Sequence, residues 1–261
     1  MDNLVKNEER LENLGIKNLR IIQNPEYFCF GIDAVLVAWF ASGSVKRKSK
    51  VIDLGTGTGI IPLLLYGHTA VEKIQALEIQ ENMAEMASRT MVYNGLEDRI
   101  EVIHGDLRTP GERVAPATYD VVISNPPYMK VGHGFENPTE TKAIARHEIL
   151  CDIEDIAVFA KRMLKNKGKL FLVHRADRLT DIISTLKKHN IETKRICFVH
   201  PYIDKPANLV LVEATKAGKP YLITDPPVIV YHRDGEYTQM INTIYGTPRP
   251  SNRVVKKAMK N

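Results

Sequence analysis

Short apolar runs alternate with amphipathic stretches from residue 51 to residue 213. The apolar runs are typical of buried parallel strands, and the stretches between them repeat apolar residues at helical spacing. We predict strands at 51–55, 74–79, 100–103, 119–124, 170–173, 196–199 and 209–213, and helices at 60–65, 81–93, 153–164 and 179–186. This alternation predicts an α/β fold, a doubly wound, mainly parallel sheet of about seven strands with helices on both faces.

Capping residues indicate where several of these elements begin and end. Asn94-Gly95 supplies a stop for helix 81–93, and Asp152 is a good N-cap for the helix from residue 153. Gly168 is expected to end that helical unit. The apolar run 228–231, followed by Asp234-Gly235, predicts a strand and turn, so residues 216–246 should pack on the sheet.

Composition narrows the class of protein. Of the 261 residues 44% are hydrophobic, which is enough for a full core, and no run approaches the roughly 18 apolar residues of a membrane helix. The N-terminus lacks the features of a signal peptide. Cys29, Cys151 and Cys197 are odd in number and far apart, which argues against a disulfide framework and against a zinc or other metal site. We therefore expect a cytoplasmic protein that does not bind a membrane.

Positive charge is concentrated at two places. The net charge is +5, and the segment 249–261 alone holds five basic residues and no acid, namely Arg249, Arg253, Lys256, Lys257 and Lys260. A second cluster, Lys46-Arg47-Lys48-Ser49-Lys50, precedes the first strong strand. Both are candidate contacts for a phosphate backbone; the tail is equally explained as a solvated segment, and the 46–50 cluster is better explained as a solvated loop.

A glycine-rich loop follows the first predicted strand. Residues 53–59 read Asp53-Leu-Gly55-Thr-Gly57-Thr-Gly59 and open a helix. Glycines here let the backbone turn tightly and approach a ligand closely. The pattern lacks the third glycine at the spacing that nicotinamide enzymes use to seat a pyrophosphate, which favours S-adenosylmethionine as the cofactor.

Three acids follow three successive strands of the predicted sheet. Glu78 can accept hydrogen bonds from both ribose hydroxyls, and the Asp106 carboxylate can reach the adenine amino group. Asp53 is placed to orient the methionine end through the glycine loop or a water molecule. A single acid after a strand is usually only solvated, but three beside one glycine loop indicate a cofactor site.

The tetrapeptide Asn125-Pro126-Pro127-Tyr128 follows the fourth predicted strand. A planar amino nitrogen is a poor nucleophile, because its lone pair is spread into a π system. The Asn125 side-chain oxygen and the Pro126 carbonyl can each accept one N–H, and two prolines fix the backbone so that these acceptors are preorganised. Tyr128 offers a flat face for stacking. This pattern predicts methyl transfer to a planar amino nitrogen, in which these four residues form the catalytic motif.

With these motifs the chain resembles the class I methyltransferases that carry an N-P-P-Y motif, and most closely the bacterial tRNA(Val) adenine-N6-methyltransferases. The resemblance covers most of the chain and includes residues 28–36, 53–59, 78, 106, 125–128, 145–148 and 170–175. It implies a Rossmann-like fold, S-adenosylmethionine as cofactor, and methylation of the adenine just 3′ of the anticodon. It also implies that Gly31 and Asp33 fold over the cofactor. From the residues alone, Gly31 is a turn and Asp33 an N-cap for a helix from Ala34.

The expected organisation has three parts. Residues 1–49 form an accessory segment that caps the cofactor site, 50–215 form the methyltransferase domain, and 216–261 form an extension with the basic tail. The cofactor-binding set comprises Gly31, Asp33, Asp53, Gly55, Gly57, Gly59, Glu78, Asp106 and Asn125.

Three alternatives remain open. Enzymes that methylate a release-factor glutamine share the N-P-P-Y core but usually have a longer N-terminal domain. A non-catalytic RNA-binding module and a nicotinamide oxidoreductase fit the site residues less well. The short N-terminal segment and the basic tail favour tRNA as the partner.

The long loop 129–148 is expected to be a substrate-facing lid. Its His133 and His147 are explained more simply as loop or capping residues than as catalytic ones. Phe135 and Tyr202 join Tyr128 as candidate stacking partners for an unstacked base, although each could equally be a packing residue.

Overall fold

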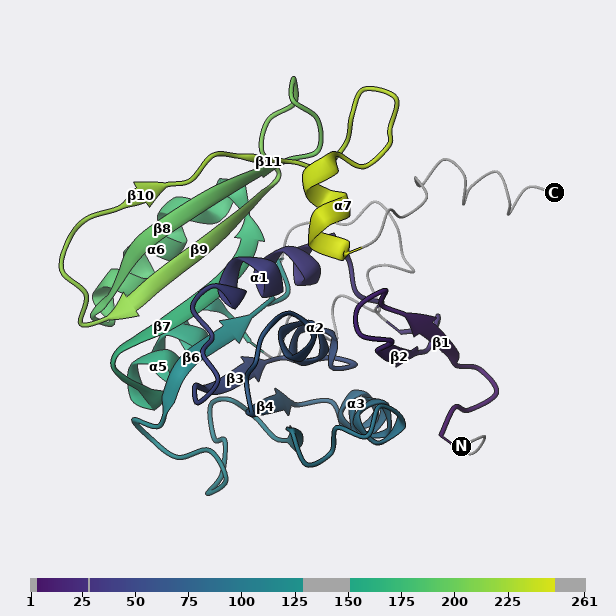
Figure 1. Cartoon of the computed structure of the whole chain (residues 1–261). Coiled ribbons are helices and arrows are strands. Elements are labelled where there is room, and N and C mark those ends of the chain that lie inside the picture. The colour runs from purple at the N-terminus through teal and green to yellow at the C-terminus, as the bar shows by residue number, and fades with distance from the viewer. Residues whose placement is uncertain (1–3, 28, 129–150, 247–261) are drawn as a thin grey trace.

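A twisted nine-stranded sheet forms the centre of the protein in the computed structural model, which describes residues 4–27, 29–128 and 151–246 (Figure 1). The strand order is β10-β8-β9-β7-β6-β3-β4-β5, with β11 also beside β8. Strands β3 to β7 are mutually parallel, and β9 runs antiparallel to both of its neighbours. The bounds are β3 (Lys50–Leu54), β4 (Lys73–Glu78), β5 (Ile100–His104), β6 (Tyr119–Ser124), β7 (Leu164–Arg175), β8 (Ile191–His200), β9 (Leu209–Lys216), β10 (Ile223–Thr224) and β11 (Val228–Ile229).

Helices cover both faces of this sheet because its central strands are apolar on both faces. Val51 points into one core and Ile52 into the other, as successive residues of a strand must. The first core also takes apolar residues from α1 (Ile32–Ser42), α2 (Ile60–His68), α3 (Glu81–Tyr93) and α7 (Gln239–Tyr245). The second takes them from α5 (Ile153–Met163) and α6 (Leu179–Lys188). The predicted doubly wound α/β fold is confirmed.

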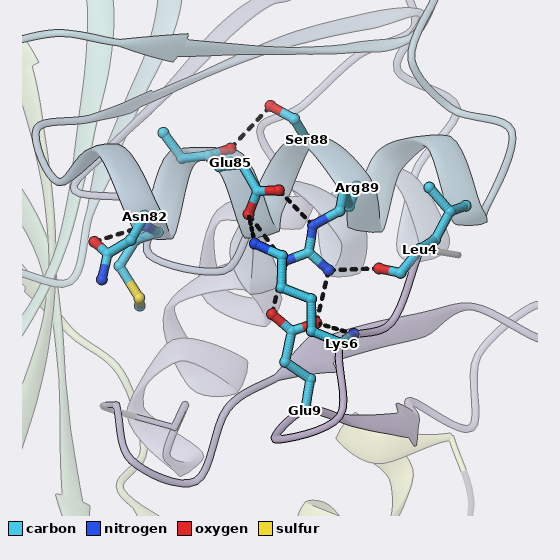
Figure 2. Close-up of polar contacts among 9 residues, drawn as sticks. Leu4, Lys6, Glu9, Asn82, Glu85, Ser88 and Arg89 are labelled. Carbon is cyan, nitrogen blue, oxygen red and sulfur yellow. Dashed lines mark hydrogen bonds and ion pairs between the residues drawn. The ribbon is translucent and has the colours of Figure 1, made fainter. Parts of the chain in front are cut away.

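The N-terminal segment is attached to α3 through a hairpin of β1 (Arg10–Asn13) and β2 (Arg20–Gln23) and a cluster of charges. Figure 2 shows the Arg89 guanidinium between the carboxylates of Glu9 and Glu85. Both Glu9 oxygens accept from it at 2.6 Å, and Glu85 Oε1 accepts from Arg89 Nε at 2.7 Å. The Arg89 and Glu9 side chains are only 13% and 3% exposed. Hydrogen bonding by Arg89 lowers the pKa of Glu9, so this nearly buried pair remains ionised.

The segment after β9 packs on the sheet, as its apolar run predicts. Both β10 and β11 pair in parallel with β8, and Tyr231 bridges to Tyr237 across the Asp234-Gly235 turn. Val228 and Ile241 are fully buried in the first core. Residues 217–246 therefore belong to the same folded body as the sheet.

Most predicted boundaries hold to within a few residues. Asp152 and Asp155 form a capping box at the start of α5, and Asn94 with left-handed Gly95 ends α3. The predicted role of Gly168 is wrong, because α5 already ends at Met163 and Gly168 lies within β7. A Cβ at Gly168 would lie 2.9 Å from the Leu164 side chain and 3.0 Å from the Tyr119 carbonyl, so close strand packing requires the glycine.

Two further predictions need correction. Helix α1 begins at Ile32 with Gly31 as its N-cap, so Asp33 lies in the first turn and is not the capping residue. The predicted strand in 228–231 joins the sheet as β11, whereas β10 was not predicted, because it is only two residues long and carries little periodicity. In the described part of the chain, no helix combines the length and apolar character needed to cross a membrane.

Candidate active site

A cavity of about 370 Å³ opens where β3, β4, β5 and β6 end. Because the carboxyl ends of parallel strands lie on the same side of a sheet, the loops that follow these strands converge there. The lining residues include Phe30, Asp33, Gly55, Gly57, Glu78, Asp106, Asn125, Pro126, Pro127, Tyr128 and Cys151. The structure thus brings together most of the residues that the sequence singles out, while Gly31, Asp53 and Gly59 are not among those that line the cavity.

The glycine loop after β3 requires glycine at three positions. Gly55, Gly57 and Gly59 have φ values of 67°, 57° and 89°, which side chains disfavour. Gly59 also lies against α3, where an added Cβ would be 2.5 Å from Met91 Cε. The loop therefore turns back tightly and exposes its backbone to the cavity.

Glu78 at the end of β4 fixes the glycine loop. Its Oε2 accepts a hydrogen bond from Gly57 N at 2.8 Å, and its Oε1 accepts from Gln80 N at 3.0 Å. The side chain is almost fully buried, yet it reaches the cavity wall. Oε1 also accepts from Gln80 Nε2 at 3.4 Å, whereas Oε2 retains a second acceptor site, so this acid can hold the loop and still bind a ligand hydroxyl.

Asp53 is completely buried beneath the loop. Within the described residues, neither carboxylate oxygen has a hydrogen-bond partner. Burial raises the pKa of Asp53 to about 8, and the nearby Glu78 charge adds to the effect. Any contact between Asp53 and a ligand would therefore pass through the loop or a water molecule.

Asp106 lies at the start of the loop after β5 and has a partner that the sequence analysis missed. Arg108 Nη2 lies 2.6 Å from Asp106 Oδ2, and Arg108 Nε lies 2.9 Å from both carboxylate oxygens. This pairing lowers the pKa of Asp106. The two-residue spacing within one loop is the signal that could have revealed the pair.

The transfer motif begins directly after β6. Ser124 Oγ donates to Leu54 O at 3.0 Å, which ties the ends of β6 and β3 together. The Tyr128 hydroxyl lies 2.6 Å from Asp33 Oδ2 and 2.6 Å from Asn125 Oδ1. Asp33 comes from the first turn of α1, so a residue far away in sequence joins the Asn-Pro-Pro-Tyr motif.

His174 is a further residue that the sequence analysis did not single out. Its ring lies 5.2 Å from the Tyr128 ring, and its Nδ1 accepts from Arg175 N at 2.9 Å. Burial lowers the pKa of His174 to about 4, so the imidazole is neutral at ordinary pH. Its position near the carboxyl end of β7 was the available signal, because functional side chains gather at strand ends of such sheets.

The candidate RNA-contact residues lie in different places. The 46–50 cluster leads into β3, whose first residue is Lys50. It therefore lies at the amino-terminal end of the strand, opposite the end where the cavity opens. Arg47 in this cluster pairs with Glu72 at 2.7 Å. Tyr202 is half-buried and packs on Tyr231. The predicted lid 129–148 with Phe135, the basic tail 249–261 and Phe28 all lie outside the described residues.

This fold and cavity define a class I methyltransferase. The chain belongs to the methyltransferase small domain family, whose model matches residues 33–198. A relative from Tolumonas auensis, named tRNA1(Val) (adenine(37)-N6)-methyltransferase, is 30% identical over 85% of this chain and 90% of its own length. One from Aeromonas hydrophila with the same name is 26% identical over 80% of this chain and 84% of its own. The resemblance found in the sequence is confirmed.

Solved structures support the same fold. A predicted O-methyltransferase from Agrobacterium tumefaciens superposes with a TM-score of 0.64 at 21% identity, covering 84% of this chain and 99% of its own. The M. jannaschii TYW2 structure in complex with AdoMet has a TM-score of 0.55 at 12% identity, covering 80% and 86%. The protein is an S-adenosylmethionine-dependent methyltransferase. In the described ranges no group of His, Cys, Asp and Glu side chains is arranged to hold a metal ion.

Proposed function

We propose that this enzyme methylates the N6 amino group of the adenine just 3′ of the anticodon in tRNA(Val). The observation that carries this proposal is Asn125-Pro126-Pro127-Tyr128 lining the cavity beside the glycine loop. The curated relatives that match most of the chain are named for this reaction. An RNA substrate also agrees with the basic tail.

The chain's own residues fit S-adenosylmethionine. Left-handed glycines bring the loop backbone to the cavity, and Glu78 and Asp106 also line it. We assign Glu78 to the ribose hydroxyls and Asp106 to the adenine amino group of the cofactor. Gly55, Gly57 and Gly59 shape the loop, and Asp53 orients the methionine end from below it. Gly31 and Asp33 belong to the segment over the cavity.

The cofactor supplies an electrophilic methyl group on a sulfonium, which is already a good leaving group. The protein's task is therefore to position the amine. The Asn125 oxygen and the Pro126 carbonyl accept the two amino hydrogens, so the nitrogen lone pair turns out of the ring. A bound cofactor would supply its methyl group to this nitrogen and keep the electron pair of the S–CH₃ bond, and the methylated amine would release one proton to water. Tyr128 stacks on the adenine.

The three expected parts of the chain have separate roles in this proposal. Phe30, Asp33 and Ala34 line the cavity, which supports residues 1–49 as a segment that caps the cofactor site. Residues 50–215 carry the methyltransferase machinery, and 216–261 extend it. The tail 249–261 and the 46–50 cluster contact tRNA phosphates. Because the cluster is at the far edge of the sheet, it would contact a part of the tRNA away from the methylated base. Such an enzyme works in the cytoplasm.

Transfer of label from the cofactor to unmodified tRNA tests the proposal. We expect N6-methyladenosine after nuclease digestion, and its loss with Asn125→Ala at unchanged tRNA binding. Label in a release factor and none in RNA would overturn the choice of substrate. Full methylation by Asn125→Ala would overturn the assignment of the transfer site, and RNA binding without any transfer by the natural chain would leave only a binding module.

A further inference from the structure

One hydroxyl joins two groups that the transfer reaction needs. Tyr128 Oη lies 2.6 Å from Asp33 Oδ2 and 2.6 Å from Asn125 Oδ1, and all three residues line the cavity. A phenol has a single hydrogen to donate. Tyr128 can therefore donate to only one of these oxygens. Which oxygen accepts determines whether the Asn125 side-chain oxygen remains available to accept a hydrogen bond from a target amine.

The carboxylate is the stronger acceptor of the two. Hydrogen bonds to an ionised group are about twice as strong as those between neutral groups. When Tyr128 donates to Asp33, its own oxygen faces the Asn125 amide as an acceptor. The two ends of an amide have the same shape and are assigned by their partners, so the nitrogen of Asn125 then turns toward Tyr128 and the oxygen turns away.

We propose that Asp33 is a positioning residue for methyl transfer, which takes the Tyr128 hydrogen and thereby keeps the Asn125 oxygen available to the target amino group. Without this acceptor, Tyr128 donates to the Asn125 oxygen and competes with the substrate. This inference rests on the proposed transfer role of Asn125 and applies equally to an adenine amine and a glutamine amide.

The surroundings of the three residues hold this arrangement in place. Asp33 Oδ1 accepts from Ala34 N at 2.9 Å, so the carboxylate is fixed to the first turn of α1. A Cβ at Gly31 would lie 2.7 Å from that same oxygen, which gives a reason for glycine at this position. The His174 ring packs against Tyr128 from β7. Burial raises the pKa of Tyr128, so its hydroxyl keeps its hydrogen.

A double-mutant cycle of Asp33→Ala and Tyr128→Phe tests the inference, with kcat and the cofactor dissociation constant measured for all four proteins. Tyr128→Phe keeps the ring and removes the hydrogen. We expect Asp33→Ala to lower kcat by about 10- to 100-fold, the cost of one misplaced hydrogen bond to a buried polar group. In the Tyr128→Phe background the same change should lower kcat by less than about 2-fold. Asp98→Ala, a change of an exposed acid outside the cavity, is the control.

Three results would overturn the inference. The first is an equal loss of kcat from Asp33→Ala in both backgrounds. The second is a weaker cofactor affinity with kcat unchanged, which would make Asp33 a cofactor contact only. The third is a larger loss from Tyr128→Phe than from Asp33→Ala, which would give the hydroxyl a role of its own.

A second variant protects the test against a local failure of folding. Gly31→Ala should displace the Asp33 carboxylate, lower kcat, and be rescued by Tyr128→Phe in the same way; absence of rescue argues against the inference. Thermal unfolding confirms that each variant is folded. If the natural chain does not methylate tRNA, the proposed function fails, and the cycle is then run on the acceptor that the natural chain does methylate.

Discussion

Replacing Asp53 by asparagine tests the electrostatics beneath the glycine loop. Asp53 is fully buried, and its pKa is raised from 3.8 to about 8. When the pKa of an acid is higher in the folded state than in the unfolded state, its contribution to the free energy of unfolding is fully present below the unfolded-state pKa. This contribution is lost as the pH rises through the folded-state pKa. Between these two values, each step of one pH unit costs about 1.4 kcal/mol. From about pH 5 to about pH 7 this one group should therefore destabilise the fold by about 3 kcal/mol.

The Asp53→Asn side chain has nearly the same shape and does not titrate, so the substitution should remove this contribution. The assay is urea unfolding of both proteins without cofactor at these two pH values. Subtracting the two unfolding free energies at each pH cancels every other titrating group. The Asp53→Asn variant should gain about 3 kcal/mol relative to the natural protein as the pH rises. A difference that stays constant within about 0.5 kcal/mol would show that Asp53 titrates normally and would refute the reasoning.

Three further substitutions test the contacts that hold the N-terminal segment, the glycine loop and Asp106 in place. Arg89→Met leaves the buried Glu9 carboxylate without its main partner and should cost about 3–5 kcal/mol in chemical unfolding; a cost below about 1 kcal/mol would contradict the buried ion pair. Gly59→Ala forces a side chain into left-handed backbone against Met91, so we expect about 1–2 kcal/mol of destabilisation and weaker cofactor binding by calorimetry. Arg108→Gln should raise the pKa of Asp106, so cofactor affinity should fall more steeply on acidification than in the natural protein, and parallel pH profiles would argue against the pairing.

The parts predictable from sequence are those in which each residue obeys a local rule. The strand predicted at 119–124 is β6 with the same bounds, because the run is apolar on both faces. The start of α5 was predicted from Asp152, because its own side chain caps the helix. The prediction for Gly168 was wrong because the glycine is needed for packing inside the sheet, against the Leu164 side chain of its own strand and the Tyr119 carbonyl of the neighbouring one. The Asp33–Tyr128 contact was equally inaccessible, since it depends on how α1 lies over the sheet. Local sequence patterns therefore predict whether a segment is a helix or a strand. Features that depend on contacts between distant segments, such as the Asp33–Tyr128 contact, could not be predicted in this way.

The acids around the cavity differ in the groups that donate hydrogen bonds to them, and this difference distinguishes their proposed roles. Glu78 accepts from the backbone, Asp106 from Arg108, and Asp33 accepts from Tyr128. Each of these groups is oriented before any ligand arrives, which is the condition for electrostatic preorganisation. Among these four acids, Asp53 alone has no such partner within the described residues, and it is fully buried. Because its raised pKa keeps Asp53 largely protonated near neutral pH, a cationic ligand above the loop would favour the ionised form, and this suits a sulfonium cofactor better than a neutral nucleoside.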